Sequence, residues 1–197
     1  MKTVIEFSML SFRLLETDFR IGFGFLLVTA VSFMRPNGIT ETCLLFCFMH
    51  ELGHLVAMRF LGARVTGVRF YGGGIGISAD TECLSRPARL IIYSAGCISN
   101  LTFALIFYII GKYTTSVVNL AIALFNLMPV SYFDGGMILQ LIFPNGEKSL
   151  KIVSGITTFI LILLFFASTL TVPAGVSVSQ LMTLFAIIAC ELIDREV

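Results

Sequence analysis

Long apolar stretches alternate with short polar segments along the chain. Six such stretches occupy about residues 21 to 34, 42 to 61, 90 to 111, 117 to 143, 152 to 171 and 176 to 193. A helix that crosses a bilayer needs roughly 20 apolar residues, and the third and fifth stretches meet this length cleanly. The first is short and ends at Arg35-Pro36, so it must borrow flanking residues or thin the bilayer locally. The pattern predicts an all-α membrane protein with about six transmembrane helices.

The connection between the second and third stretches has a different pattern. Apolar and polar residues alternate over 65 to 71 and again over 75 to 77, with a run of glycines between the two. Period-two alternation around a glycine turn is typical of a β-hairpin. We therefore expect a small membrane-associated β-hairpin over 62 to 80, close to the candidate functional residues described below. A connection of about 28 residues has no room for an inserted domain, because independent domains rarely fall below about 50 residues.

Composition places the chain in lipid. Hydrophobic residues make up 57% of the 197 residues and charged residues 13%, and the mean hydropathy is +0.96. We expect one integral membrane domain over 1 to 197, with its core at 42 to 143. Residues 1 to 20 mix acidic and basic side chains, unlike a cleavable signal peptide, and are expected to form a cytoplasmic N-terminal segment. The net charge of +1 gives no basic field that would recruit nucleic acid.

The positions of the basic residues predict the orientation. If all six stretches span the bilayer, all but two of the 13 Lys and Arg residues lie on the side of the N-terminus. The two exceptions are Arg35 and Lys112. Cytoplasmic loops are enriched in Lys and Arg, so we expect both termini in the cytoplasm of a bacterial plasma membrane, with the active site toward the cytoplasmic side.

The second stretch contains an H-E-x-x-H pattern formed by His50, Glu51 and His54. Residues four apart lie on one face of a helix, about 6 Å apart along its axis, so both imidazoles can bind one metal ion. Glu51 lies beside them, where its carboxylate can take a proton from a water molecule activated by zinc and pass it to a leaving amine. The pattern predicts one zinc ion per chain and hydrolysis of a peptide bond.

A catalytic zinc ion usually has three protein ligands, and the chain has only two histidines, so a carboxylate or a thiolate must be the third. Asp134 is the strongest candidate because it lies inside an apolar stretch, where an unpaired charge is costly. Pro129 and Gly135-Gly136 break the helix beside it, and broken backbone in a membrane lies against protein or a hydrated cavity. Asp134 could instead only cap the helix that begins at Gly135.

The cysteines form no C-x-x-C pair and are expected to be small core residues. They are Cys43, Cys47, Cys83, Cys97 and Cys190. Cys43 and Cys47 share a helical face with the two histidines. Four ligands at these spacings would extend over about 16 Å of helix, which is too far for one ion.

With these motifs the chain resembles the site-2 protease family of intramembrane zinc metalloproteases, and specifically its compact, sporulation-protease-like members without a PDZ insert. In that family the Asp of an N-x-x-P-x-x-x-L-D-G segment, two helices after H-E-x-x-H, completes the metal site. Residues 126 to 135 read N-L-M-P-V-S-Y-F-D-G here, with Phe133 at the Leu position. Residues 95 to 100 are similar to the family's A-G-P-x-x-N segment, with Cys97 at the Pro position.

The resemblance implies a zinc-dependent endopeptidase that cuts single-pass membrane proteins within or near the bilayer. It implies that Asn126 helps to hold the substrate or the reaction intermediate, and that Asn100 and Pro129 support the site. Asn126 could also serve only as a helix breaker, and Asn100 only as a hydrogen-bonding residue between helices. The β-hairpin could pair with an unwound substrate strand, since strand addition would hold a peptide bond extended.

Three other functions fit part of this pattern. An intramembrane metal-ion transporter, or another metal-binding membrane protein, would use the same His and Asp residues as ligands but has no need for Glu51. A catalytically silent scaffold would need none of them. A zincin that processes prenylated proteins also contains H-E-x-x-H but takes a downstream Glu as a ligand, and the glutamates available for that role are Glu82, Glu147, Glu191 and Glu196. The pattern names neither the substrate nor the oligomeric state.

Overall fold

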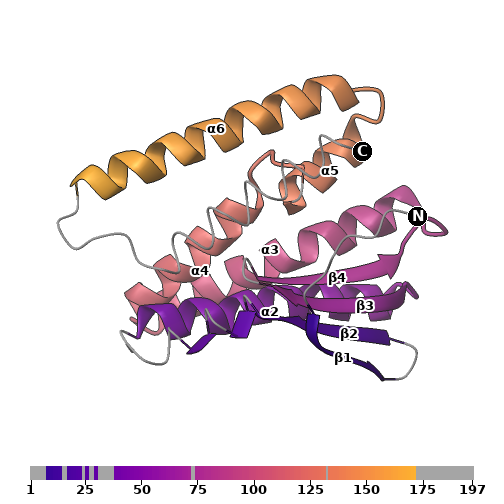
Figure 1. Cartoon of the computed structure of the whole chain (residues 1–197), viewed down its shortest axis with the longest axis horizontal. Coiled ribbons are helices and arrows are strands. Elements are labelled where there is room, and N and C mark those ends of the chain that lie inside the picture. Colours follow the sequence, from indigo (N-terminus) through magenta and orange to yellow (C-terminus); the bar gives the residue numbers. More distant parts are fainter. Residues whose placement is uncertain are drawn as a thin grey trace.

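The structure is a computed structural model that describes residues 8–14, 17–23, 25–26, 29–30, 38–71, 74–131 and 133–171. Its elements, in chain order, are β1 (Ser8–Leu14), β2 (Thr17–Gly22), α2 (Ile39–Phe60), β3 (Arg64–Tyr71), β4 (Gly74–Asp80), α3 (Arg86–Ile109), α4 (Tyr113–Asn126), α5 (Asp134–Ile142) and α6 (Glu147–Thr171). The described chain is therefore mostly helical, with one small sheet. The sheet and α6 lie on opposite sides of the other helices (Figure 1).

The sheet is larger than the hairpin expected from the sequence. Its strand order is β1-β2-β3-β4, and β3 and β4 form the predicted antiparallel hairpin. β2 pairs with β3 in parallel, which requires a crossover connection, and α2 is part of that connection. The prediction for residues 1 to 20 missed β1 and β2. A signal for β2 was present, because polar Asp18 and Arg20 alternate with apolar Phe19 and Ile21.

The six expected membrane spans are only partly observed. Within the described ranges, two helices are long and apolar enough to cross a membrane, at Glu41–Phe60 and Arg86–Ile109. They correspond to the second and third apolar stretches, and α6 contains the fifth. The fourth stretch is divided between α4, with 14 residues, and α5, with nine, so each is shorter than a spanning helix. The first stretch overlaps the end of β2 and otherwise lies largely outside the described residues, as the sixth does entirely.

Helices α2 and α3 pack closely because a glycine lies at their contact. A Cβ atom at Gly53 of α2 would lie 2.9 Å from the Ala95 carbonyl oxygen of α3. Small residues at such contacts let helix backbones approach one another in membranes.

α3 begins at the N-cap residue Ser85, whose hydroxyl accepts a hydrogen bond from the Ala88 backbone N–H at 3.4 Å. The buried stripe of α3 therefore faces α2 at a fixed position.

The chain breaks between α4 and α5, as Pro129 and the paired glycines predicted. A Cβ atom at Gly135 or Gly136 would overlap the carbonyl group of Leu127 or Val130, so only glycine allows α5 to fold back against this segment. The backbone of the break is also hydrogen-bonded to α6, because the Ser131 N–H donates to Ser154 Oγ at 3.0 Å. The break thus has a defined conformation supported by a neighbouring helix.

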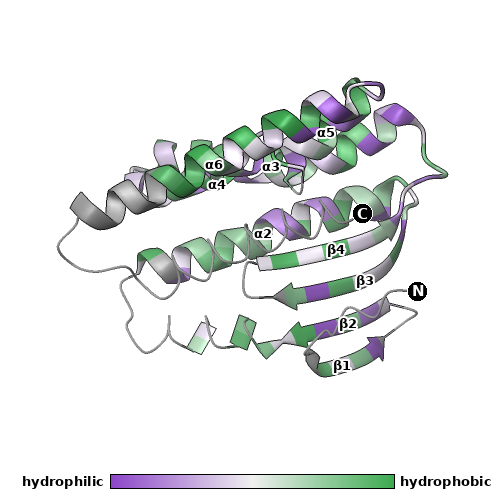
Figure 2. Cartoon of the chain, turned by 45° about the horizontal axis from the view of Figure 1, so that its top comes forward, coloured by the Kyte–Doolittle hydropathy of each residue, from purple (hydrophilic) through white to green (hydrophobic). Residues whose placement is uncertain are grey.

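The outer faces of the helices are apolar. Large hydrophobic side chains are exposed on α2 and α3, and Phe60 and Ile109 have 87% and 73% of their surface exposed. Figure 2 shows hydrophobic residues along the helices, whereas hydrophilic and hydrophobic positions alternate along the strands. Water-soluble proteins rarely expose apolar surface on this scale. The helices therefore suit a lipid environment.

Candidate metal centre

The two histidines of α2 lie one helical turn apart and turn the same ring atom toward each other. His50 Nε2 and His54 Nε2 are 3.2 Å apart, and the residues are only 3% and 6% exposed. This arrangement follows from the i, i+4 spacing of the H-E-x-x-H pattern on a helix. Two nitrogens of a kind that can bind a metal are thus held together inside the helix bundle.

Asp134 brings a third donor atom to the same place from a distant part of the chain. Its Oδ2 lies 3.1 Å from His50 Nε2 and 3.2 Å from His54 Nε2. Zinc bonds to nitrogen and oxygen of about 2.0 to 2.1 Å, in a tetrahedral arrangement, put donor atoms about 3.3 Å apart. The nearly equilateral triangle of donor atoms therefore fits one zinc ion.

Asp134 is the first residue of α5, and the N-cap position is occupied by Phe133. No side-chain hydrogen bond caps this helix, so the carboxylate is directed to the two histidines. The alternative in which Asp134 only caps α5 is wrong. The helix break explains why this carboxylate can turn toward α2.

The other ring nitrogens are held by hydrogen-bond acceptors. His54 Nδ1 lies 2.7 Å from the Ile92 carbonyl oxygen, which can only accept, so this nitrogen carries the proton. His50 Nδ1 lies 3.0 Å from Asn100 Oδ1 and donates to it. Fixing the proton on Nδ1 leaves the Nε2 lone pair of each ring free to bind a metal.

Asn100 belongs to a buried polar chain between three helices. Its Nδ2 donates to the Phe46 carbonyl oxygen and to Asn119 Oδ1, each at 3.4 Å, which assigns the remaining oxygen to His50. Asn119 in turn donates to the Thr115 carbonyl oxygen at 2.9 Å. Both asparagines are fully buried. Of the two roles considered for Asn100, hydrogen bonding between helices is observed, and its partner is a histidine of the centre.

Gly96 lies directly against the histidines. A Cβ atom at this position would lie 2.6 Å from His50 Nε2 and closer still to His54 Nε2. The missing side chain lets the backbone of α3 approach these two nitrogens.

Glu51 follows His50 on α2 and is half-buried. Its carboxylate lies close enough to both histidines and to Asp134 to interact with them electrostatically. The general-base candidate therefore interacts electrostatically with all three donor residues.

Two residues expected to support the site have other neighbours. Asn126, at the end of α4, donates from Nδ2 to the Ile122 carbonyl oxygen of its own helix at 3.0 Å. Pro129 lies in the segment that breaks the chain before α5. Asn126 thus ends α4, and its proposed contact with a substrate stays a prediction.

Three residues near the centre were not identified from the sequence. Asn119 and Gly96 could have been suspected, because one is a polar residue inside an apolar stretch and the other belongs to the second family-like segment. Cys97 was expected to be a small core residue, and it is buried, with 2% exposure. However, its Sγ lies 3.2 Å from Asp134 Oδ2, so it belongs to the centre.

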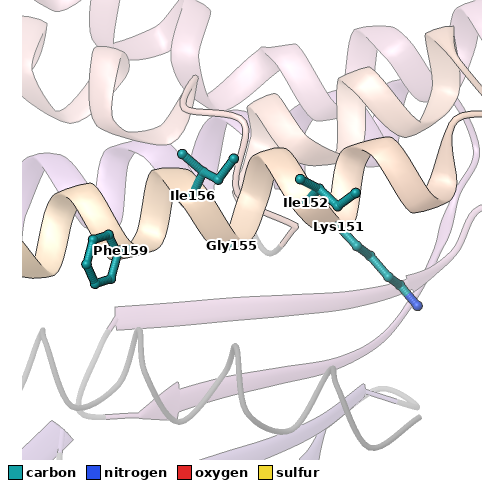
Figure 3. Close-up of a pocket in the computed structure, with 5 residues that line it drawn as sticks. All are labelled: Lys151, Ile152, Gly155, Ile156 and Phe159. Carbon is teal, nitrogen blue, oxygen red and sulfur yellow. The ribbon is translucent and has the colours of Figure 1, made fainter.

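Two hollows of about 450 and 420 Å³ lie on the surface of the described residues. The first is on α6, where Ile152, Ile156 and Phe159 line it with Lys151 at one end (Figure 3). The second lies between β4 and the helices of the centre, and its lining includes Met58, Tyr93 and Met137. Met58 is one turn beyond His54, so the second hollow lies close to the centre.

A scan against protein-family models and a search of curated proteins gave no match to the chain. Among solved structures, the site-2 protease from Methanocaldococcus jannaschii aligns with 92% of this chain and 95% of its own, with a TM-score of 0.64 and 19% sequence identity. The fold is that of a site-2 protease. The site-2 protease fold agrees with the resemblance that two short motifs indicated.

Proposed function

We propose that this chain is a zinc-dependent intramembrane endopeptidase that hydrolyses peptide bonds of membrane-spanning substrates. The observation that carries the proposal is the buried triangle of His50, His54 and Asp134 with Glu51 beside it. The site-2 protease fold supports it, since a solved structure with this fold is named as a protease.

Each residue of the centre has a role in this reaction. His50, His54 and Asp134 would hold the zinc ion, which when bound would supply a Lewis acid for lowering the pKa of water and polarising the scissile carbonyl group. Glu51 takes a proton from the attacking water and delivers it to the leaving amine. Asn100 and the Ile92 carbonyl group hold the two rings in one orientation throughout.

The edge of the sheet supports a binding mode for the substrate. β4 is an outer strand of the described sheet, and residues of β4 and of the helices of the centre together line the hollow of about 420 Å³. A peptide bond inside a helix is shielded, so the substrate must be extended before water can attack it. Strand addition to β4 would hold it extended, with backbone hydrogen bonds that do not depend on the side chains of the substrate.

The membrane arrangement belongs to the same proposal. We place the chain in a bacterial plasma membrane as a multi-pass protein with cytoplasmic termini and a centre toward the cytoplasmic side. The distribution of Lys and Arg supports this orientation, and the exposed apolar faces of α2 and α3 support contact with lipid. The substrate would be a single-pass membrane protein.

The proposal is tested by comparing the cleavage of membrane segments by the wild-type chain and by the variant Glu51→Gln. The wild-type chain and the variant are purified in detergent, loaded with zinc and incubated with a library of single-pass membrane segments, and products are identified by mass spectrometry. We expect cleavage by the wild type and a loss of at least about 100-fold in the variant, because general-base catalysis contributes about 10²–10⁴-fold. Glu82→Gln is the matched control, since Glu82 is exposed in the loop before α3.

Glu51→Gln also separates the protease from a metal-ion transporter. A transporter would move the ion without this carboxylate, and it would cut no peptide. Undiminished cleavage by Glu51→Gln would sink the proposed mechanism. Zinc transport into vesicles by a chain that cleaves no segment of the library would favour the transporter.

A further inference from the structure

Cys97 has a second possible role besides packing, because its sulfur lies against the triangle of donor atoms. Cys97 Sγ is 3.2 Å from Asp134 Oδ2, the same separation that joins this oxygen to His54 Nε2. The residue is 2% exposed, so the thiol faces the centre and not lipid or solvent. The sulfur therefore lies beside the carboxylate, at the edge of the cluster of donor atoms.

The packing of α3 explains this position. Gly96 lets the helix backbone approach His50 and His54, and the next residue along the chain is Cys97. One ligand atom each from His50, Cys97 and Asp134 lie within 4.8 Å of one another. Three helices thus contribute to one cluster, and α3 contributes the sulfur.

We propose that Cys97 is a fourth ligand of the zinc ion in the resting protein, an inference that rests on the proposed function. Thiolate is among the strongest zinc ligands in proteins, with a bond of about 2.3 Å. When the sulfur binds, its S–H bond breaks, the proton passes to solvent and a bond from sulfur to zinc forms. No electron is transferred, and no other reactant is needed.

This ligand closes the centre. A zinc ion bound by His50, His54, Asp134 and Cys97 has four protein ligands, which is the composition of a structural site, whereas a catalytic site keeps one position for water. The sulfur must leave and take up a proton before water can enter. The resting protein is therefore latent until the sulfur leaves.

The competing role of Cys97 is a hydrogen bond from its thiol to Asp134. In that case the sulfur orients the carboxylate and never binds the ion. A thiol is a weak donor, and Oδ2 already faces two histidine nitrogens. The two roles differ in one measurable property, the presence of sulfur among the atoms bonded to zinc.

X-ray absorption spectroscopy at zinc measures this property in the wild-type protein. The sample is the full chain in detergent, loaded with one equivalent of zinc and no substrate. We expect one sulfur at about 2.3 Å in addition to nitrogen and oxygen at about 2.0 to 2.1 Å. A wild-type spectrum with nitrogen and oxygen alone would overturn the inference without any variant.

Two variants identify the sulfur. Cys97→Ser is expected to lose the sulfur signal, and in the cobalt-loaded protein it is expected to lose the thiolate-to-cobalt charge-transfer band. Cys47→Ser is the matched control, because Cys47 lies on α2 one turn before Glu51, and it should keep both signals. A sulfur signal that survives Cys97→Ser would come from another cysteine and would refute the assignment.

The same spectra separate this inference from the proposed function. Zinc bound by two imidazoles and a carboxylate without sulfur, in a chain that cleaves its substrate, would refute only the role of Cys97. A wild-type chain that retains no zinc would refute the proposed function and this inference together.

Discussion

Asn100 is the residue that connects the metal centre to the surrounding helices. Its Oδ1 accepts from His50 Nδ1, and its amide nitrogen donates to groups on α2 and α4. A histidine ligand held in this way keeps one tautomer and one ring orientation. Without Asn100, the His50 ring would have a buried N–H with no acceptor, and such a group costs about 1–3 kcal/mol.

Asn100→Ala is therefore predicted to weaken zinc binding by about 10–100-fold, the range found when partners of metal ligands are removed. Competition with a chelator of known affinity measures the change. Asn126→Ala is the comparison, because the Asn126 amide bonds to the Ile122 carbonyl group and not to a histidine. It should bind zinc as the wild type does. Equal zinc affinity of Asn100→Ala and the wild type would refute the positioning role.

Gly96 has a steric role at the same scale. A methyl group there would meet both Nε2 atoms, so Gly96→Ala should displace the rings and remove zinc binding. Gly67→Ala is the control, since a Cβ atom at Gly67 has its nearest neighbour at 3.4 Å, an ordinary contact. The check is zinc content after gel filtration. A Gly96→Ala chain with full zinc content would show that α3 can move aside.

The break between α4 and α5 is the element that delivers Asp134. Pro129 and the two glycines let α5 turn back, and Ser154 of α6 accepts a hydrogen bond from the Ser131 N–H of the break. Asp134 then stands at the start of α5, opposite the histidines. The position of the Asp134 carboxylate depends on this backbone conformation.

Gly136→Ala tests this dependence. The added methyl group would overlap the Val130 carbonyl group, and overpacking of this kind costs about 1–3 kcal/mol. We expect a lower melting temperature in detergent together with reduced zinc content, because Asp134 is two residues away. An unchanged melting temperature with full zinc content would mean that the break tolerates a side chain and does not fix Asp134.

The sequence identified the residues that the structure brings together better than it identified the elements around them. The spacing in H-E-x-x-H places both histidines on one face of a helix. Asp134 is easily recognised because it is a charged residue in an apolar stretch. The helix break at Pro129 and Gly135-Gly136 could also be predicted from the sequence. The contacts of Gly96 and Cys97 were not, because they depend on which face of α3 meets α2, and hydrophobic periodicity does not identify the partner of a face.

The sheet also depends on contacts between segments that are far apart in the sequence, and such contacts could not be predicted from local patterns. The β3–β4 hairpin is local in sequence and was predicted, whereas the parallel pairing of β2 with β3 joins strands separated by the whole of α2. A short strand near the start of the chain cannot be distinguished from a polar terminal segment until the strand that pairs with it is known. The four-stranded sheet was therefore visible only in the structure.

At the scale of the whole molecule, a polar centre is enclosed by helices whose outer faces are apolar. The buried polar residues include His50, His54, Asn100 and Asn119, while large hydrophobic side chains such as Phe60 and Ile109 are exposed. Water-soluble proteins rarely expose so many large apolar side chains around buried polar residues, whereas a lipid environment favours this distribution. The site-2 protease fold and the sheet beside the centre complete the arrangement in which a membrane segment could be held and cut.

Zinc content per chain, measured by mass spectrometry of the purified protein, is the most direct check that His50, His54 and Asp134 hold a catalytic ion. We predict one zinc per chain in the wild type and in Glu51→Gln, and nearly none in Asp134→Ala. The full wild-type content in Asp134→Ala would contradict the account, because the ion would then be held without the carboxylate that α5 brings to the histidines.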